Sequence, residues 1–365
     1  MDRKIRVLVV DDSAFMRRAL TRMLGSDHTI EVAGEAADGE EGLRKVKKLR
    51  PDVVTLDVKM PGMDGLTVLQ NIMAECPVPV LMLSSLTSEG GEVTLRALEM
   101  GATDFIDKSM AHTALDILGI AGELIAKVKT AAGVDARKMV RRQAARAPQG
   151  PETPGAQAPP SPKGGRLDAI AIGTSTGGPP ALQTILAGLP ASLSAPVLVV
   201  QHMPKGFTAS LAGRLDRLSG MSVSEAVDGD RASPGRCLIA PSGLHMTIIR
   251  DGGGLTVRLS EEPAGFLHRP SVDVLMESVA RTAGKKALGV ILTGMGADGA
   301  RGIKALHDAG AATMAQDENS SVVYGMPKAA VEMGGVDISL PLEQIGRAII
   351  LKTAGEAIDF PPSMP

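Results

Sequence analysis

The 365-residue sequence predicts an α/β protein of two doubly wound parallel-sheet domains, joined by a proline-rich linker. Three observations lead to this fold class. Short apolar runs alternate with segments of helical period in both halves of the chain, which is typical of parallel sheets covered by helices. A segment rich in proline separates the halves. The length itself corresponds to about two domains of ordinary size.

Residues 1–129 are predicted to form the first domain. The apolar runs IRVLVV, DVVTL and VPVLMLS are its expected buried strands. Between them, AFMRRALTRMLG and EEGLRKVKKL have apolar residues three and four positions apart, the spacing of one helix face. The first of these helices is expected to stop at Gly25, because glycine commonly ends helices.

Residues 130–166 are predicted to form an extended linker. Six prolines lie between Pro148 and Pro162, and the segment has almost no large apolar side chains. Such a composition cannot bury enough apolar surface to offset the entropy lost on folding. The linker is therefore expected to separate two domains without building a core of its own.

Residues 167–355 are predicted to form the second domain. Its expected strands are AIAI, VLVVQ, ALGVILT and TMAQ, and its expected helices are PALQTILAGL, TASLAGRLDRL and RGIKALHDAG. The stretch HMTIIRDGGGLTVRLSE predicts a β-hairpin, because DGGG supplies turn residues between two alternating segments.

Composition argues against several classes of protein. A formal net charge of -2 and the lack of a compact basic helical segment argue against nucleic acid as a partner. The two cysteines, Cys76 and Cys237, lie in different halves, which favours a reducing compartment over a disulfide framework. The N-terminal MDRKIRVLVVDDS has too short an apolar run for a signal peptide or a membrane span. We therefore expect a cytoplasmic protein without membrane insertion.

Polar side chains follow four predicted strands of the first domain. Asp11 and Asp12 follow IRVLVV, Asp57 follows DVVTL, Ser84 ends VPVLMLS and Lys108 follows DFID. Ligands of open parallel sheets bind beyond the carboxyl ends of the strands, so these groups are expected to converge. Three carboxylates at one edge suit a magnesium ion (Mg²⁺), which prefers oxygen ligands. The competing interpretation is that they are helix caps and loop acids.

Such a pocket can accept a phosphoryl group on Asp57, because the metal and Lys108 neutralise the charge of the transferring oxygens. The segments VVDDS, LDVKMPGMDG, MLSS and DFIDKS, in this order, resemble the flavodoxin-like receiver domain of two-component response regulators. The resemblance implies that Asp57 is phosphorylated, that Asp11 and Asp12 hold the metal with it, and that Lys108 assists. It also implies a switch formed by Ser84 and Phe105, although an aromatic residue here is as often part of the core.

The stretch GTSTGG directly follows the predicted strand AIAI. It fits G-x-S-x-G, in which a tight turn exposes a serine hydroxyl at the top of a sheet, here that of Ser175. A phosphate-binding loop would need a Lys-Ser or Lys-Thr pair, which is absent from this stretch, and Ser175 takes the place of a glycine in the dinucleotide fingerprint. A flexible corner remains the alternative.

A base and an acid are expected at the same edge as Ser175. His202 follows VLVVQ and Asp298 follows ALGVILT, so three strands deliver the residue types of a Ser-His-Asp triad. Asp317, which follows TMAQ, is the rival acid. The other histidines of this half, His245, His268 and His307, are interpreted as structural.

The order serine, histidine, aspartate differs from that of α/β-hydrolases. GTSTGG, QHMPKGFT, IAPSGLHM, HRPSVD and LTGMGADGA in succession instead resemble the Rossmann-like catalytic domain of chemotaxis protein-glutamate methylesterases, the CheB family. The resemblance implies the triad Ser175, His202 and Asp298, with backbone N–H groups near Thr176 and Met295 as oxyanion donors. Together with the N-terminal receiver, the resemblance covers nearly the whole chain, and only the proline-rich linker lies outside it.

The CheB resemblance also implies the activity. The expected enzyme is activated by phosphorylation, removes methyl groups from γ-glutamyl methyl esters of chemoreceptors and deamidates receptor glutamines. Its expected partners are these receptors and a chemotaxis histidine kinase; Mg²⁺ serves phosphorylation, and the ester chemistry needs no cofactor. Two alternatives stay open: a receiver-controlled esterase or amidase for another substrate, and a phosphorylation-dependent binding protein without catalysis.

Overall fold

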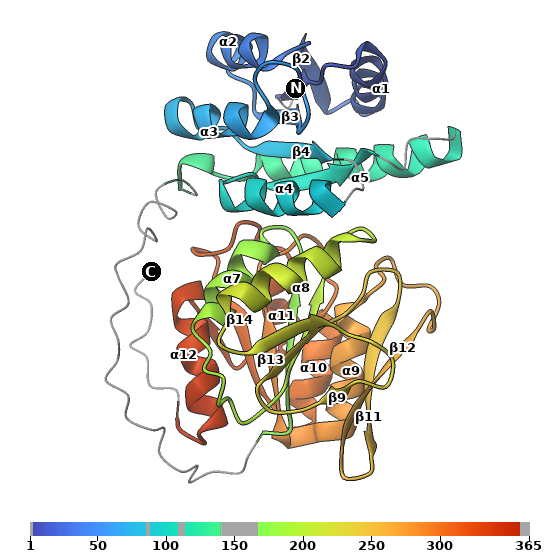
Figure 1. Ribbon diagram of the computed structural model, residues 1–365, viewed down its shortest axis with the longest axis vertical. Coiled ribbons are helices and arrows are strands. Elements are labelled where there is room, and N and C mark those ends of the chain that lie inside the picture. Colours follow the sequence, from blue (N-terminus) through green and yellow to red (C-terminus); the bar gives the residue numbers. More distant parts are fainter. Residues whose placement is uncertain (1–2, 85–87, 109–113, 139, 141–166, 358–365) are drawn as a thin grey trace. The chain divides into compact units, whose positions relative to one another are not determined.

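The computed structural model describes residues 3–84, 88–108, 114–138, 140 and 167–357 (Figure 1). Most of the predicted linker, residues 139 and 141–166, lies outside the described residues. The helix before it extends to Ala132, beyond the predicted domain limit at residue 129. The chain divides into two compact units, Met1–Thr153 and Pro154–Pro365, and each unit is described by itself.

The first unit contains a five-stranded parallel sheet of order β2-β1-β3-β4-β5. Apolar side chains of α1 and α5 pack on one face of the sheet, and α2, α3 and α4 cover the other (Figure 1). The strands are β1 (Ile5–Val10), β2 (Ile30–Ala36), β3 (Val53–Asp57), β4 (Val80–Ser84) and β5 (Asp104–Asp107). The helices are α1 (Ala14–Gly25), α2 (Gly39–Leu49), α3 (Gly65–Glu75), α4 (Ser88–Glu99) and α5 (Ala114–Ala132).

The second unit contains a seven-stranded parallel sheet of order β15-β14-β13-β6-β7-β10-β8. Helices α7, α8 and α12 lie together on one face, and α9, α10 and α11 lie on the other (Figure 1). The strands are β6 (Ala169–Thr174), β7 (Val197–Gln201), β8 (Ser222–Glu225), β10 (Arg236–Ile239), β13 (Ala287–Ile291), β14 (Ala312–Gln316) and β15 (Ile338–Leu340). The helices are α7 (Gly178–Ala187), α8 (Phe207–Leu218), α9 (Val272–Ala283), η2 (Gly284–Lys286), α10 (Ala300–Asp308), α11 (Met326–Glu332) and α12 (Leu342–Thr353).

The predicted hairpin belongs to a separate antiparallel sheet that the fold-class prediction did not include. Strands β11 (His245–Asp251) and β12 (Gly254–Ser260) pair antiparallel, and β9 (Arg231–Ala232) pairs with β12. Both turn residues, Gly252 and Gly253, have positive φ values of 54° and 84°, which glycine adopts without steric cost. Met246, Ile248 and Val257 of the hairpin pack into the core of the second unit.

Both parallel sheets have a switch point that creates a crevice at the carboxyl ends of the strands. In the second unit, β7 lies on one side of β6 and β13, which comes later in the chain, lies on the other side of β6. In the first unit the corresponding pair is β1 and β3. Loops that leave neighbouring strands in opposite directions open a space between them, and ligands of such sheets bind there. The two doubly wound sheets confirm the predicted fold class.

Candidate functional site

The carboxylates predicted in the first unit lie together at its switch point. Asp11 follows β1, is fully buried and accepts a hydrogen bond from the backbone N–H of Ser13 at 2.9 Å. The Nζ atom of Lys108 lies 2.8 Å from Oδ2 of Asp11 and 2.8 Å from Oδ2 of Asp57. Burial raises the pKa of Asp57, and the ion pair with Lys108 opposes this shift. The lysine therefore bridges two strand ends.

This pocket has the composition of a magnesium site. Ligand oxygens of Asp11, Asp12 and Asp57 lie within 4.8 Å of one another. Asp12 is exposed, while the other two are buried. Three carboxylates face a single ammonium group, so the pocket retains negative charge that a hard divalent cation would compensate. The donor set thus fits Mg²⁺.

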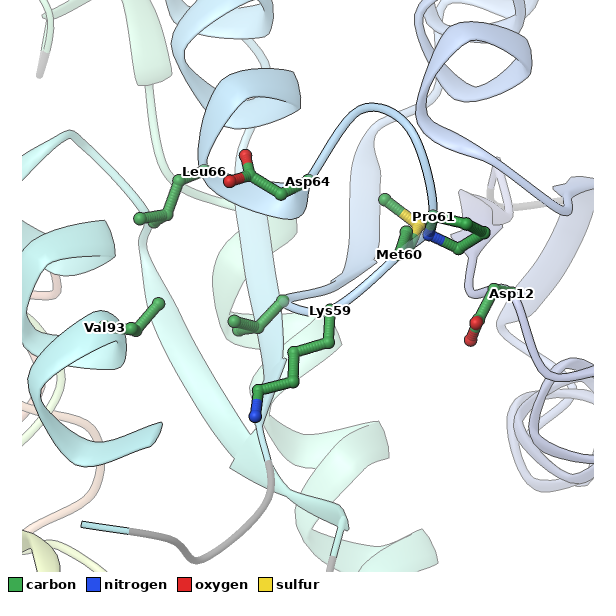
Figure 2. Close-up of a pocket in the computed structure, with 8 residues that line it drawn as sticks. Asp12, Lys59, Met60, Pro61, Asp64, Leu66 and Val93 are labelled. Carbon is green, nitrogen blue, oxygen red and sulfur yellow. The ribbon is translucent and has the colours of Figure 1, made fainter. Parts of the chain in front are cut away.

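A cavity of about 450 Å³ adjoins this cluster, next to the loop between β3 and α3 (Figure 2). Asp12 belongs both to the cavity wall and to the carboxylate cluster. Figure 2 shows the Lys59 side chain beneath the same loop, which continues through Met60 and Pro61 to Asp64. The remaining lining residues are Val58, Leu66 and Val93. The predicted metal site is therefore open on one side to a partly apolar cavity.

The two predicted switch residues lie on neighbouring strands. Ser84 at the end of β4 is buried and accepts a hydrogen bond of 2.8 Å from Oγ1 of Thr94 on α4. Phe105 on β5 is also buried, and Nζ of Lys127 lies 5.3 Å from the centre of its ring. The structure thus places Phe105 in the interior, where the residue contributes to the core.

The GTSTGG stretch forms a tight turn between β6 and α7. The backbone N–H of Ser175 donates to Thr293 O at 3.1 Å, and Ser175 O accepts from the N–H of Gly178 at 2.8 Å. Gly177 has a φ of 78°, and a Cβ atom at Gly178 would lie 1.9 Å from Oε1 of Gln201. The two glycines are therefore required by backbone conformation and by close approach. Ser175 itself is half-buried.

Gln201, the last residue of β7, connects the serine turn to the histidine. Its side-chain Nε2 donates to the carbonyl oxygens of Ser175 at 2.9 Å and of His202 at 3.0 Å. The backbone N–H of His202 donates to Thr174 O at 3.1 Å. These bonds hold the ends of β6 and β7 together, so the serine and the histidine leave the sheet side by side.

His202 and Asp298 form a hydrogen-bonded pair. Nε2 of His202 lies 2.8 Å from Oδ2 of Asp298. Asp298 also accepts hydrogen bonds from Oγ of Ser271 at 2.8 Å and from the N–H groups of Val272 at 2.8 Å and Asp273 at 3.1 Å. Burial acts to raise the pKa of Asp298, but these bonds and His202 outweigh it and lower the pKa to about 2.

The ionised carboxylate determines which ring nitrogen of His202 can act as a base. Because Asp298 is acceptor-only at neutral pH, the nitrogen facing it, Nε2, carries the ring proton. The lone pair of the neutral ring then belongs to Nδ1. Within the described part of the chain, Nδ1 is buried and has no hydrogen-bond partner. The roles of the two nitrogens are reversed relative to chymotrypsin-type triads, in which Nδ1 faces the aspartate.

The rival acid and two of the three other histidines are bonded to other residues. Asp317 accepts hydrogen bonds from the N–H and Oγ of Ser320, in the loop after β14. His245 is buried and accepts a hydrogen bond from the N–H of Ser271, and His307 is a half-buried residue of α10 that pairs with Asp308 and Asp337. His268 was interpreted as structural, but its ring stacks on that of His202.

The predicted oxyanion donors flank Ser175. A Cβ atom at Gly294 would lie 2.9 Å from Cβ of Ser175, so the segment before Met295 passes directly beside the serine. Thr176 is buried, and its carbonyl oxygen accepts a hydrogen bond from Oγ1 of Thr293 at 3.0 Å. Both positions are therefore in the loops that line the serine.

Sequence reasoning missed four residues that support this site. Gln201 and Thr293 fix the serine turn, and Ser271 supports Asp298. Asp273 accepts bonds from the N–H groups of Gly299 and Gly302, which holds the loop after Asp298. The one sequence signal for these residues was the stretch HRPSVD. Ser271 directly precedes α9, where serine is a preferred N-cap, and Asp273 lies in the first turn of that helix.

Comparisons with known proteins assign a family to each half of the chain. The CheB methylesterase family matches residues 170–349, and the response regulator receiver domain matches residues 7–117. A Pseudomonas aeruginosa relative, "Protein-glutamate methylesterase/protein-glutamine glutaminase 2", is 49% identical over 350 residues and covers 96% of this chain and 97% of its own. An Oleidesulfovibrio alaskensis relative, "Protein-glutamate methylesterase/protein-glutamine glutaminase 1", is 46% identical over 366 residues, with coverages of 95% and 98%.

A solved structure is similar to the second unit. The Thermotoga maritima CheB methylesterase catalytic domain is 40% identical, with a TM-score of 0.50, and covers 51% of this chain and 98% of its own. A receiver domain followed by an α/β domain that holds a hydrogen-bonded His-Asp pair defines a response regulator with an enzyme-type output domain. Within that class, the chain belongs to the CheB methylesterase family.

No helix of the described residues is long and apolar enough to cross a membrane.

Proposed function

We propose that this protein is a receiver-controlled hydrolase that removes methyl groups from γ-glutamyl methyl esters of chemoreceptors and deamidates receptor glutamines during chemotactic adaptation. The observation that carries the proposal is the His202–Asp298 pair, which leaves Nδ1 of His202 as a base next to the Ser175 turn. The names of relatives that share almost the full length of the chain support the same activity.

The proposed reaction proceeds through an acyl-enzyme. Oγ of Ser175 attacks the ester carbonyl carbon while Nδ1 of His202 takes its proton. The C–O bond to the methoxy group then breaks, and His202 returns the proton so that methanol leaves. A water molecule, deprotonated by His202, attacks the acyl carbon and releases glutamate and the free serine. With a glutamine substrate the leaving group is ammonia.

Backbone N–H groups near Thr176 and Met295 are the proposed donors to the oxyanion. Thr176 directly follows Ser175 in the loop after β6, and the loop after β13 approaches Ser175 at Gly294, next to Met295. Donors held by the backbone need no reorganisation as negative charge develops on the carbonyl oxygen. Such a donor contributes about 2.7 to 4 kcal/mol to transition-state stabilisation in serine proteases.

The proposed control is phosphorylation of Asp57 by a chemotaxis histidine kinase. Asp11, Asp12 and Asp57 would hold Mg²⁺, which would neutralise part of the negative charge on the oxygens of the transferring phosphoryl group. Lys108 already contacts both Asp11 and Asp57 and would contact a phosphoryl oxygen in the same place. Ser84 and Phe105 are the proposed readers of the phosphorylated state. We place this system in the cytoplasm, in keeping with the two free cysteines.

Methanol release from methylated receptor membranes, with and without a phosphoryl donor, tests the proposal. We expect release that rises when acetyl phosphate and Mg²⁺ are added, and no such rise in Asp57→Asn. Hydrolysis of a panel of small soluble esters without any release from receptors would instead identify an esterase for another substrate. A chain that neither releases methanol nor reacts with a fluorophosphonate would be a non-catalytic binding protein.

A further inference from the structure

His268 lies against the face of His202 in the candidate active site. The two ring centres are 4.1 Å apart and the ring planes differ by 22°, so the imidazoles are stacked. His268 belongs to the loop between β12 and α9, whereas His202 directly follows β7. The contact therefore joins two segments that are far apart in the chain.

The hydrogen bonds of His202 do not by themselves fix the orientation of its imidazole ring. Nε2 is bonded to Asp298, and Nδ1 has no hydrogen-bond partner within the described residues. A single hydrogen bond holds one ring atom and still lets the ring tilt about that bond. A flat group pressed against the ring face limits the tilt, so that Nδ1 keeps one direction.

The loop that carries His268 is itself anchored on both sides. Before it, the ring of Phe266 meets that of His245 edge-on at 5.5 Å between centres and lies 5.5 Å from the guanidinium carbon of Arg301. After it, Ser271 caps α9 and donates to Asp298. The same loop thus supports the acid and the face of the base.

We propose that His268 is a positioning residue, which holds the His202 imidazole in the orientation needed for proton transfer from the serine. The proposal rests on the proposed function only in taking His202 as the base.

Three variants of the full-length protein test this role. His268→Ala removes the stack, His268→Phe keeps a flat ring of similar size, and His307→Ala, at a half-buried histidine of α10, is the matched control. Two rates are measured: labelling by a fluorophosphonate, which needs an activated serine but no receptor, and methanol release from methylated receptor membranes. Thermal unfolding establishes that each variant is folded.

We expect His268→Ala to slow both labelling and kcat for methanol release by about tenfold to a hundredfold, with KM for the receptor unchanged. His268→Phe should restore most of both rates, and His307→Ala should match the unchanged protein. If the alanine variant does not fold, His268→Leu, which fills the space without a flat ring, replaces it.

Labelling of His268→Ala or His268→Leu at the wild-type rate would overturn the proposal. If His268→Ala is slow, an equally slow His268→Phe would also overturn it. Normal labelling combined with impaired methanol release would also overturn it, since His268 would then act on the substrate. If the unchanged protein is labelled but releases no methanol, the methylesterase proposal fails, while the labelling comparison still decides the role of His268.

Discussion

Asp298 lies 2.8 Å from His202 and at the N-terminus of α9, where it accepts hydrogen bonds from the first two backbone N–H groups of the helix and from its capping serine. The positive end of the helix dipole and these donors stabilise the carboxylate form. The acid of the pair is therefore held by a helix terminus as well as by its histidine. Charge on Asp298 keeps the ring proton of His202 on Nε2.

Replacing that charge should remove the base. In Asp298→Asn we expect a loss of about 10²-fold to 10⁴-fold in kcat for methanol release, because a neutral amide no longer fixes the tautomer with a free Nδ1. Residual activity would come from oxyanion donors and binding. Steady-state kinetics on methylated receptor membranes measure the loss, and Asp317→Asn is the matched control. Equal losses in the two variants would contradict the assignment of Asp298.

The stability of the second unit should depend on the ionisation of Asp298. Its pKa is lowered to about 2, below the value of about 3.9 for an unperturbed aspartate. The carboxylate therefore stabilises the folded state above pH of about 4, and this contribution is lost as the pH falls through about 2. The free energy of unfolding of the unchanged protein should exceed that of Asp298→Asn at pH 7, and the difference should shrink in acid. A difference independent of pH would be evidence against this linkage.

Two glycine substitutions should differ sharply in effect. A Cβ atom at Gly178 would lie 1.9 Å from the side-chain amide of Gln201, so Gly178→Ala must displace the amide that bonds Ser175 and His202. We expect a lower free energy of unfolding. We also expect at least tenfold slower fluorophosphonate labelling, because a misplaced catalytic group lowers the reaction rate. Gly213 on α8 has open space, and Gly213→Ala should be neutral or stabilise by up to about 1 kcal/mol. Similar labelling rates in both variants would refute this account of the turn.

Ser175→Ala should abolish hydrolysis and leave the fold intact. Loss of a triad serine costs on the order of 10⁴-fold to 10⁶-fold in rate. Methanol release and fluorophosphonate labelling check this, with Ser222→Ala, at an exposed serine of β8, as the control. Release within tenfold of the unchanged protein would remove Ser175 from the mechanism.

Acetyl phosphate with Mg²⁺ should label the protein once, at Asp57. The label should be an acyl phosphate that alkali removes, and Asp57→Asn should prevent it, whereas Asp52→Asn, at an ion pair with Arg3, should not. Mass spectrometry of the intact chain measures the added phosphate. Labelling that persists in Asp57→Asn or without any divalent cation would be incompatible with the assigned pocket.

Local sequence determined much of the secondary structure. Helix α1 begins and ends where the pattern predicted, at Ala14 and Gly25, because Ser13 caps it and its apolar residues repeat at helical spacing. Strand β7 likewise has the predicted bounds, Val197–Gln201, since a short apolar run between turns has few alternatives. The same patterns placed the predicted acid pocket and the serine turn at strand ends.

Local patterns left Asp298 and Asp317 as rivals, since both follow apolar strands; the family resemblance implied Asp298, and the tertiary structure brings it to His202. Strand order decides between them: β13 pairs directly with β6, which carries Ser175, while β14 pairs with the far side of β13. The loop after β13 therefore reaches His202, and the loop after β14 binds Ser320. His268, Gln201 and Ser271 were undetermined for the same reason, because contacts between segments distant in the chain depend on how strands and helices pack, which local periodicity does not encode.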